Sequence, residues 1–217
     1  MAASISRSVS GNALSILCAG ASRLLVAFGL VLAGAGAASA SEKAAQSAVV
    51  GFASEIVALA NSGRSDAAKR AGVQSILQRR ADIDKIVQIA AGRPWKTMSA
   101  GQRASFKSAM LPYMAMRFVS FFDQVRGTTT EVKDAKTFTG RTTRVRVRTV
   151  SRGNGSPKKI TWWVASKGGR QVIQDAVIGD SLRVAFALRG EVQGYFSSAG
   201  GNVDKVNAQL RSATNSG

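Results

Sequence analysis

The apolar positions in the first part of the chain repeat with the period of an α-helix. The spacing predicts a helix over 44–60, with Val49, Phe52, Ile56 and Leu59 on one face. The Asn-Ser-Gly sequence that follows is typical of a helix end. The pattern therefore indicates an amphipathic helix that covers a core.

Two shorter helices are predicted next, each beginning at a capping side chain. Ser65 caps the first and Asp82 caps the second, because a short polar side chain accepts hydrogen bonds from the free N–H groups of a first turn. Gly92 and Pro94 end the second helix, and Trp95 follows at the corner. The apolar stripes of the two helices are Val73, Ile76 and Leu77 in the first and Ile83, Ile86, Val87 and Ala90 in the second.

The longest predicted helix runs from Ser99 to about Val125. Ser99 and Gln102 form an S-x-x-Q capping box at its start, and Pro112 predicts a kink in its middle. Because methionine adapts to varied apolar shapes, its stripe suits the wall of a ligand cavity, although the same periodicity is typical of an ordinary core. The stripe consists of Phe106, Met110, Met114, Phe118, Phe121 and Phe122.

After Gly127 the period changes from helical to alternating. Strands are predicted over 128–139, 142–150, 159–165 and 171–178. In the second strand Val145 and Val147 face one side, while Arg144, Arg146 and Arg148 face the other, as in a half-exposed antiparallel strand. Trp162 and Trp163 should point to opposite sides of the third strand, and Leu182, Val184 and Phe186 alternate again after the fourth.

The order of these elements predicts an α+β fold. N-terminal helices should pack on a C-terminal twisted antiparallel sheet of about four strands that encloses an apolar pocket. The chain becomes helical again from about residue 188, and a last short helix is expected over 203–210. We expect one domain, over residues 41–217.

The first 40 residues have the features of a cleaved signal peptide. Arg7 and Arg23 are the only charged residues before Glu42, and 24–37 is an apolar run of roughly 14 residues, short for a membrane span. Ala38-Ser39-Ala40 is a small-x-small cleavage site. We expect export to the periplasm and cleavage after Ala40, with a retained membrane anchor as the alternative.

The composition of the mature chain excludes many kinds of active site. Removing 40 of the 217 residues leaves 177 and lowers the net charge from +18 to +16, because the leader holds two arginines and no acids. Cys18 lies in the leader and the sequence has no histidine, so nucleophilic Cys or His sites and zinc sites with those ligands are excluded. A pair of carboxylates remains possible, but the acids are scattered beside basic residues. We expect no catalytic residue, metal or cofactor.

Several short motifs, in order, resemble the MlaC-type family, also called toluene-tolerance auxiliary transport proteins. The resemblance extends from about Ser47 to Leu210. It implies a periplasmic carrier whose pocket holds phospholipid acyl chains, and which shuttles lipid between an outer-membrane lipoprotein complex and an inner-membrane ABC transporter with a lipid-binding ring. The motifs are Asp82, the Gly92–Trp95 corner, Gln102-Arg103 with Phe106, then Asp175, Gly179-Asp180-Ser181-Leu182 and Arg189.

A carrier of this kind needs an apolar lining, which the long helix and one face of the sheet can supply. In addition to the helix stripe given above, we expect lipid contacts from Val145, Val147, Trp162, Val164, Leu182, Val184, Phe186 and Phe196. The lipid species, phospholipid or another apolar cargo, does not follow from the sequence.

A basic face is expected on the sheet, and it leaves two other functions open. The face consists of Arg144, Arg146, Arg148, Lys158 and Lys159, and would make transient contact with an anionic membrane or an acidic partner. Strong basicity beside Trp163 also suits an exported nucleic-acid or polyanion binder, although export argues against nucleic acid. An NTF2-like enzyme is the third possibility, with Asp175 as its candidate acid.

Overall fold

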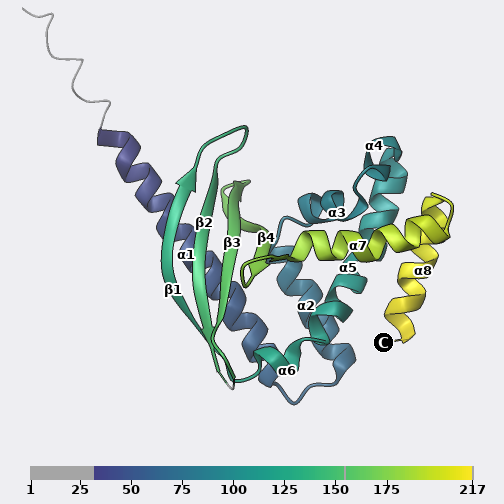
Figure 1. Ribbon diagram of the computed structural model, residues 1–217, viewed down its shortest axis with the longest axis horizontal. Helices are drawn as coiled ribbons and strands as arrows, with labels where there is room; N and C mark the ends of the chain where they lie inside the picture. The colour runs from purple at the N-terminus through teal and green to yellow at the C-terminus, as the bar shows by residue number, and fades with distance from the viewer. Residues whose placement is uncertain (1–31, 154, 217) are drawn as a thin grey trace, which may run out of the picture.

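The computed structural model describes residues 32–153 and 155–216, with side chains from residue 41 onward, and its fold is α+β as expected (Figure 1). Long α1 runs along the sheet, and the other helices extend to one side of it (Figure 1). The helices are α1 (Leu32–Asn61), α2 (Asp66–Arg80), α3 (Ile83–Ala91), α4 (Pro94–Thr97), α5 (Ala100–Val119), α6 (Phe122–Val125), α7 (Val184–Ser198) and α8 (Val203–Ser216). The strands are β1 (Thr129–Phe138), β2 (Arg144–Arg152), β3 (Lys158–Lys167), β4 (Arg170–Ile178) and β5 (Leu182–Arg183).

The five strands form an antiparallel meander in the order β1-β2-β3-β4-β5. The alternation predicted for β2 is confirmed: Val145 and Val147 are buried, and the arginines between them lie on the opposite face. Val147 pairs with Trp162, and Val145 pairs with Val164, so one face of the sheet is apolar. We call this the inner face, and the face that carries the arginines the outer face.

Helix α1 covers the inner face of the sheet. The ring of Phe52 in α1 lies 5.7 Å from the ring of Trp162, centre to centre, in an edge-to-face arrangement. Glu42 at the other end accepts hydrogen bonds from the backbone N–H and the hydroxyl of Thr137 in β1. The part of α1 over 41–61 is long and apolar enough to cross a membrane by length and composition. Its buried stripe, however, packs into the core as that of an ordinary amphipathic helix.

The predicted caps are present at the helix starts. Ser65 accepts a hydrogen bond from the N–H of Ala68, and Asp82 accepts one from the N–H of Lys85. The capping box of Ser99 and Gln102 forms in both directions. Gly92 ends α3 with a φ of 63°, and a side chain there would also meet Arg189. These local signals position the helices that face the sheet.

Two predicted boundaries are wrong, and each has a local cause. The helix expected from Ser99 to Val125 ends at Val119, where the Ser120 hydroxyl donates to the carbonyl of Arg117, and α6 is a separate turn. Pro112 lies inside α5 without interrupting it. The alternation expected over 182–186 is not a strand beyond Arg183, because α7 begins at Val184 rather than near residue 188.

The early start of α7 follows from a buried carboxylate. Asp175 in β4 accepts hydrogen bonds from the backbone N–H of Ala185, in the first turn of α7, and from the guanidinium of Arg183. A carboxylate that binds a first-turn N–H stabilises the start of a helix at that residue. The predicted leader lies mostly outside the described residues, and the cleavage point after Ala40, inside α1, stays a prediction.

Candidate functional site

Most of the predicted lipid-contact residues lie together in one continuous core between the helices and the inner face of the sheet. Phe106 and Phe196 pack ring against ring where α5 meets α7, with 5.7 Å between centres. Phe118 and Val184 are partly buried against the same core. Its buried predicted members are Phe106, Met110, Met114, Phe122, Val145, Val147, Trp162, Val164 and Phe196. The structure therefore brings the helix stripe and the inner face together, as the sequence predicts.

Three predicted contacts lie apart from that core. Phe121, Leu182 and Phe186 are 48%, 52% and 47% exposed. Leu182 and Phe186 were expected to face inward on an alternating strand, which α7 replaces. The Arg183 guanidinium lies over the Phe186 ring, 4.6 Å from its centre, so this ring is covered by a cation rather than by the core.

A cavity opens at the end of the inner face where the β1–β2 loop, β3 and β4 meet the start of α1. It has a volume of about 330 Å³, which is within the range of about 300–1,000 Å³ usual for small-molecule sites but at its low end. Val145 and Val164 are the two predicted contacts that line it. Its other lining residues are Ser41, Thr142, Thr143, Ala165, Ser166, Gln171 and Gln174.

The polar lining of this cavity was not predicted from the sequence. The Oε1 atom of Gln171 is buried and has no hydrogen-bond partner among the described residues. Gln174, in contrast, donates from Nε2 to Asp82. Both glutamines belong to a strand segment whose neighbouring residues are mostly apolar. These two polar residues were the sequence signal that could have indicated a polar lining. Their position beside Val145 depends on strand pairing, which the sequence does not reveal.

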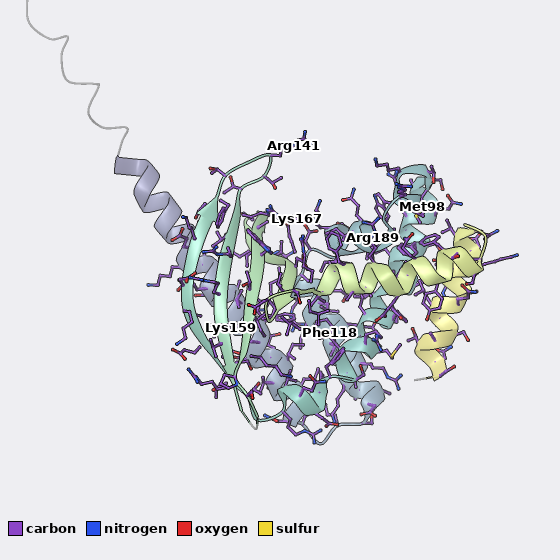
Figure 2. All side chains as sticks on the ribbon, in the orientation of Figure 1. Met98, Phe118, Arg141, Lys159, Lys167 and Arg189 are labelled. Atoms are coloured by element: carbon purple, nitrogen blue, oxygen red, sulfur yellow. The ribbon has the colours of Figure 1, made fainter. Side chains whose placement is uncertain are left out.

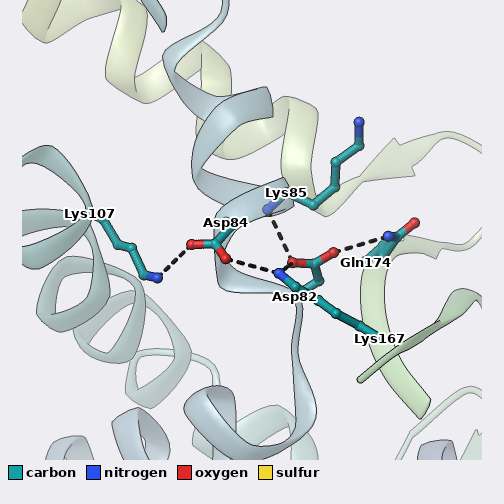
Figure 3. A network of polar contacts seen from close by, with 6 residues as sticks. All are labelled: Asp82, Asp84, Lys85, Lys107, Lys167 and Gln174. Carbon is teal, nitrogen blue, oxygen red and sulfur yellow. Dashed lines mark hydrogen bonds and ion pairs between the residues drawn. The ribbon is translucent and has the colours of Figure 1, made fainter. Parts of the chain in front are cut away.

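A cluster of charged side chains joins the helices to the sheet beside this cavity (Figure 3). Asp82, with a side chain only 8% exposed, accepts from Lys167 Nζ at 2.7 Å and from Gln174 Nε2 at 3.1 Å. Lys167 also lies 2.9 Å from a carboxylate oxygen of Asp84, whose other oxygen accepts from Lys107 in α5. We call Asp82, Asp84, Lys107, Lys167 and Gln174 the clasp.

The clasp favours the ionised forms of Lys167 and Asp84. The hydrogen bonds that Lys167 donates to Asp82 and Asp84 raise the pKa of Lys167, and the hydrogen bonds that Asp84 accepts from Lys107 and Lys167 lower the pKa of Asp84. The backbone reinforces the contact, since the N–H of Asp82 donates to the carbonyl of Ile173 in β4 at 2.8 Å. The clasp thus joins α3 and α5 to the strand ends at the mouth of the cavity.

The predicted basic face divides into two parts. Arg144, Arg146 and Arg148 share the outer face, as expected, and Arg148 forms a two-point ion pair with Asp134 of β1. Lys159 is exposed on β3. Its neighbour Lys158 donates instead to Gln124 of α6, on the helical side of the sheet. Lys158 therefore does not belong to the outer face.

The candidate catalytic acid, Asp175, has its hydrogen-bonding capacity taken up by the fold. Its carboxylate is buried and accepts from the N–H groups of Ala176 and Ala185 and from Arg183. It does not line the cavity beside Val145. Within residues 41–216, other than residue 154, no group of three or more acidic side chains could hold a metal ion. The arrangement suits the binding of an apolar molecule better than acid–base chemistry.

The comparisons with known proteins agree with this geometry. The family model described as MlaC protein matches residues 52–212, which is well over half of the chain. The chain belongs to the MlaC family. The matched region of this MlaC-family protein includes the clasp, the sheet and both C-terminal helices.

A solved structure of similar fold contains a lipid. It is the phospholipid-binding protein from Ralstonia solanacearum, in complex with a phospholipid. It superimposes with a TM-score of 0.61 at 21% sequence identity, over 76% of this chain and 98% of that one. At this identity the likeness shows a shared fold. No curated protein sequence matches this chain significantly.

Proposed function

We propose that this MlaC-family protein is a periplasmic carrier that holds the acyl chains of a phospholipid between its helices and the inner face of its sheet. The observation that carries the proposal is the family match over residues 52–212, supported by the phospholipid bound to a protein of the same fold. Both point to binding rather than catalysis. The hydrogen bonds that Asp175 accepts within the fold favour binding over the enzyme alternative.

Loading a lipid would extend the cavity into the core. Two acyl chains need more volume than about 330 Å³, so the helices and the inner face must move apart on loading. Met110 and Met114 are placed in the core where such an adjustment is needed, and methionine side chains repack readily. Each methylene buried contributes roughly 0.8 kcal/mol, so two chains supply ample free energy for this rearrangement.

The proposed transport cycle has two membrane ends. The leader predicted over 1–40 would direct the chain to the periplasm. There it would carry lipid between an outer-membrane lipoprotein complex and an inner-membrane ABC transporter with a lipid-binding ring. A carrier without an energy source of its own cannot set the direction of this transport.

Lipid bound to the purified protein tests the carrier function directly. The full chain is expressed, the exported protein is purified and its organic extract is analysed by mass spectrometry. We expect about one phospholipid per protein. Gln171→Trp should fill the cavity and lower the lipid content several-fold, while Arg170→Trp, at the exposed neighbouring residue, should leave it unchanged. A protein that is free of lipid and binds DNA in a salt-sensitive way would overturn the proposal in favour of the polyanion binder.

A further inference from the structure

Among the described residues, no helix packs extensively on the outer face of β1–β3. Over β1, β2 and β3, α1 is the helix that makes extensive contact, and it packs on the inner face through Phe52 and Trp162. The strands that form the outer face are at one side of the molecule, with the β1–β2 loop and its Arg141 at their tip (Figure 2). This face is therefore open to whatever the protein meets.

Near the β1–β2 loop, at one end of this face, cations surround a pair of aromatic rings. Phe138 of β1 and Trp163 of β3 meet edge to face, with 5.6 Å between their centres. Arg144 lies over Trp163 at 4.8 Å, and Arg146 and Lys136 lie over Phe138 at 5.2 and 5.8 Å. We call these five residues the aromatic–cation cluster. Strand pairing fixes it, because Phe138 is opposite Arg144 and Arg146 is opposite Trp163.

The charges of the cluster are only partly compensated. Asp134 is the nearest acid, and it is occupied by Arg148, with Arg146 more distant at 3.9 Å. Arg144 and Lys136 form no ion pair within the described part of the chain. The Nε atoms of Arg144 and Arg146 are buried and have no hydrogen-bond partner there either. Arg144 and Lys136 are therefore left without a described acid to neutralise them, and such cations can bind an anion.

Four acids lie on or beside the outer face, and three of them are already paired with a cation. Glu131 contacts Lys133 and Arg152, Asp134 contacts Arg148, and Asp175, opposite Trp163, contacts Arg183. The fourth, Asp180, lies in the turn after β4. Because the acids are mostly neutralised, the net field of this face is positive and attracts an anionic surface.

We propose that the outer face of β1–β3 docks the protein on the surface of an anionic lipid bilayer through the aromatic–cation cluster. Lipid phosphates would bind Arg144, Arg146 and Lys136. As these cations turn toward the phosphates, the rings of Phe138 and Trp163 would contact the boundary between head groups and acyl chains, where aromatic side chains are favoured. The docking gives the carrier proposed above a way to approach a membrane, but it needs no bound lipid.

The geometry favours a bilayer over other anionic partners. Single-stranded nucleic acid is held by stacking of successive bases on a series of aromatic rings, whereas the two rings of this cluster form a single edge-to-face pair. The cavity beside Val145 lies on the inner face, so it offers no recess on the outer face for an acidic peptide. A bilayer requires only an exposed surface with cations around apolar groups, and Phe138, within the cluster, is 37% exposed.

Binding to vesicles of defined composition tests the docking. The purified exported protein is sedimented with vesicles of phosphatidylglycerol and phosphatidylcholine in equal parts, and with phosphatidylcholine alone. We expect binding to the anionic vesicles only. Lys136→Gln with Arg144→Gln should weaken it about 20-fold. Lys96→Gln with Lys205→Gln removes the same charge from exposed positions on α4 and α8, and should change it less than about twofold.

Fluorescence of Trp163 supplies a second measurement. On anionic vesicles the tryptophan emission should shift to shorter wavelength, and Trp163→Phe should abolish the shift while Trp95→Phe retains it. Three results would overturn the docking. One is that both double variants weaken vesicle binding equally, and another is that the emission shift persists in Trp163→Phe. The third is that an acidic peptide binds this face while anionic vesicles do not. Lipid content measured on the same variants separates the two proposals, because loss of docking should leave the phospholipid bound and Gln171→Trp should leave docking intact.

Discussion

The two faces of the sheet are formed by the same strands but differ in chemical character. On the inner face, Val147 is fully buried against Trp162, and the Trp162 Nε1–H donates to the hydroxyl of Thr149. On the outer face, Arg146 and Arg148 both contact the carboxylate of Asp134, and Arg146 also lies over the ring of Phe138. The comparison teaches that adjacent residues of β2 carry separable properties. The inner residues determine stability, and the outer ones determine what the surface attracts.

The test with the largest expected effect places an asparagine on each face of β2 in turn. Val147→Asn should lower the free energy of unfolding by about 3–5 kcal/mol, because it creates space in the core and buries an amide without partners. Arg148→Asn, one residue away, should change it by less than about 1 kcal/mol. Urea denaturation followed by circular dichroism measures both. Similar losses in the two variants would show that the outer face also supports the fold.

A second contrast separates the buried and exposed acids of the clasp. Asp82→Ala should cost about 2–3 kcal/mol, because it removes the cap of α3 and the acceptor for Lys167 and Gln174. Asp84→Ala removes an acid that is 57% exposed and should cost less than about 1 kcal/mol. Thermal unfolding measures the difference, and it would be contradicted by equal midpoints for the two variants.

The extent to which the sequence predicted these features depends on how local their causes are. The caps at Ser65, Asp82 and Ser99 and the alternation in β2 were predicted, because each is determined within a few residues. The clasp was not predicted, because Lys167 and Asp82 are 85 residues apart in the sequence and meet only when the chain folds. The start of α7 was also misplaced, because it depends on a hydrogen bond between Asp175 of β4 and the N–H of Ala185.

The candidate site shows the same limit. Its apolar members were predicted from periodicity, and they came together as a core. Periodicity could not place the cavity at one end of that core, beside Gln171 and Gln174, because packing defects arise where elements meet rather than within one element. Exposed Phe186 was misassigned because a short alternating run fits a strand or the first turn of a helix equally well.

Alkaline pH should distinguish the clasp from the outer ion pair. The pKa of Lys167 is raised in the fold, so its contribution to stability is complete below its unfolded value of about 10.4 and is lost as the pH rises through the folded value. The Asp134–Arg148 pair should persist, because a guanidinium stays charged in this range. Unfolding free energies measured on both sides of about pH 10.4 should fall less in Lys167→Arg than in the wild type. An identical fall in the two proteins would mean that Lys167 does not contribute through its charge.

The smallest expected effect is the coupling between Asp134 and Arg148 on the outer face. Their side chains are 34% and 55% exposed, so solvent and the entropy of two mobile side chains offset much of their attraction. A double-mutant cycle with Asp134→Ala and Arg148→Ala should give a coupling of about 0.2–1 kcal/mol at low salt, decreasing as the Debye length falls to about 3 Å near 1 M salt. A coupling above about 2 kcal/mol that salt does not weaken would make this pair a structural element. The outer face could then no longer be treated as a surface free to rearrange its cations.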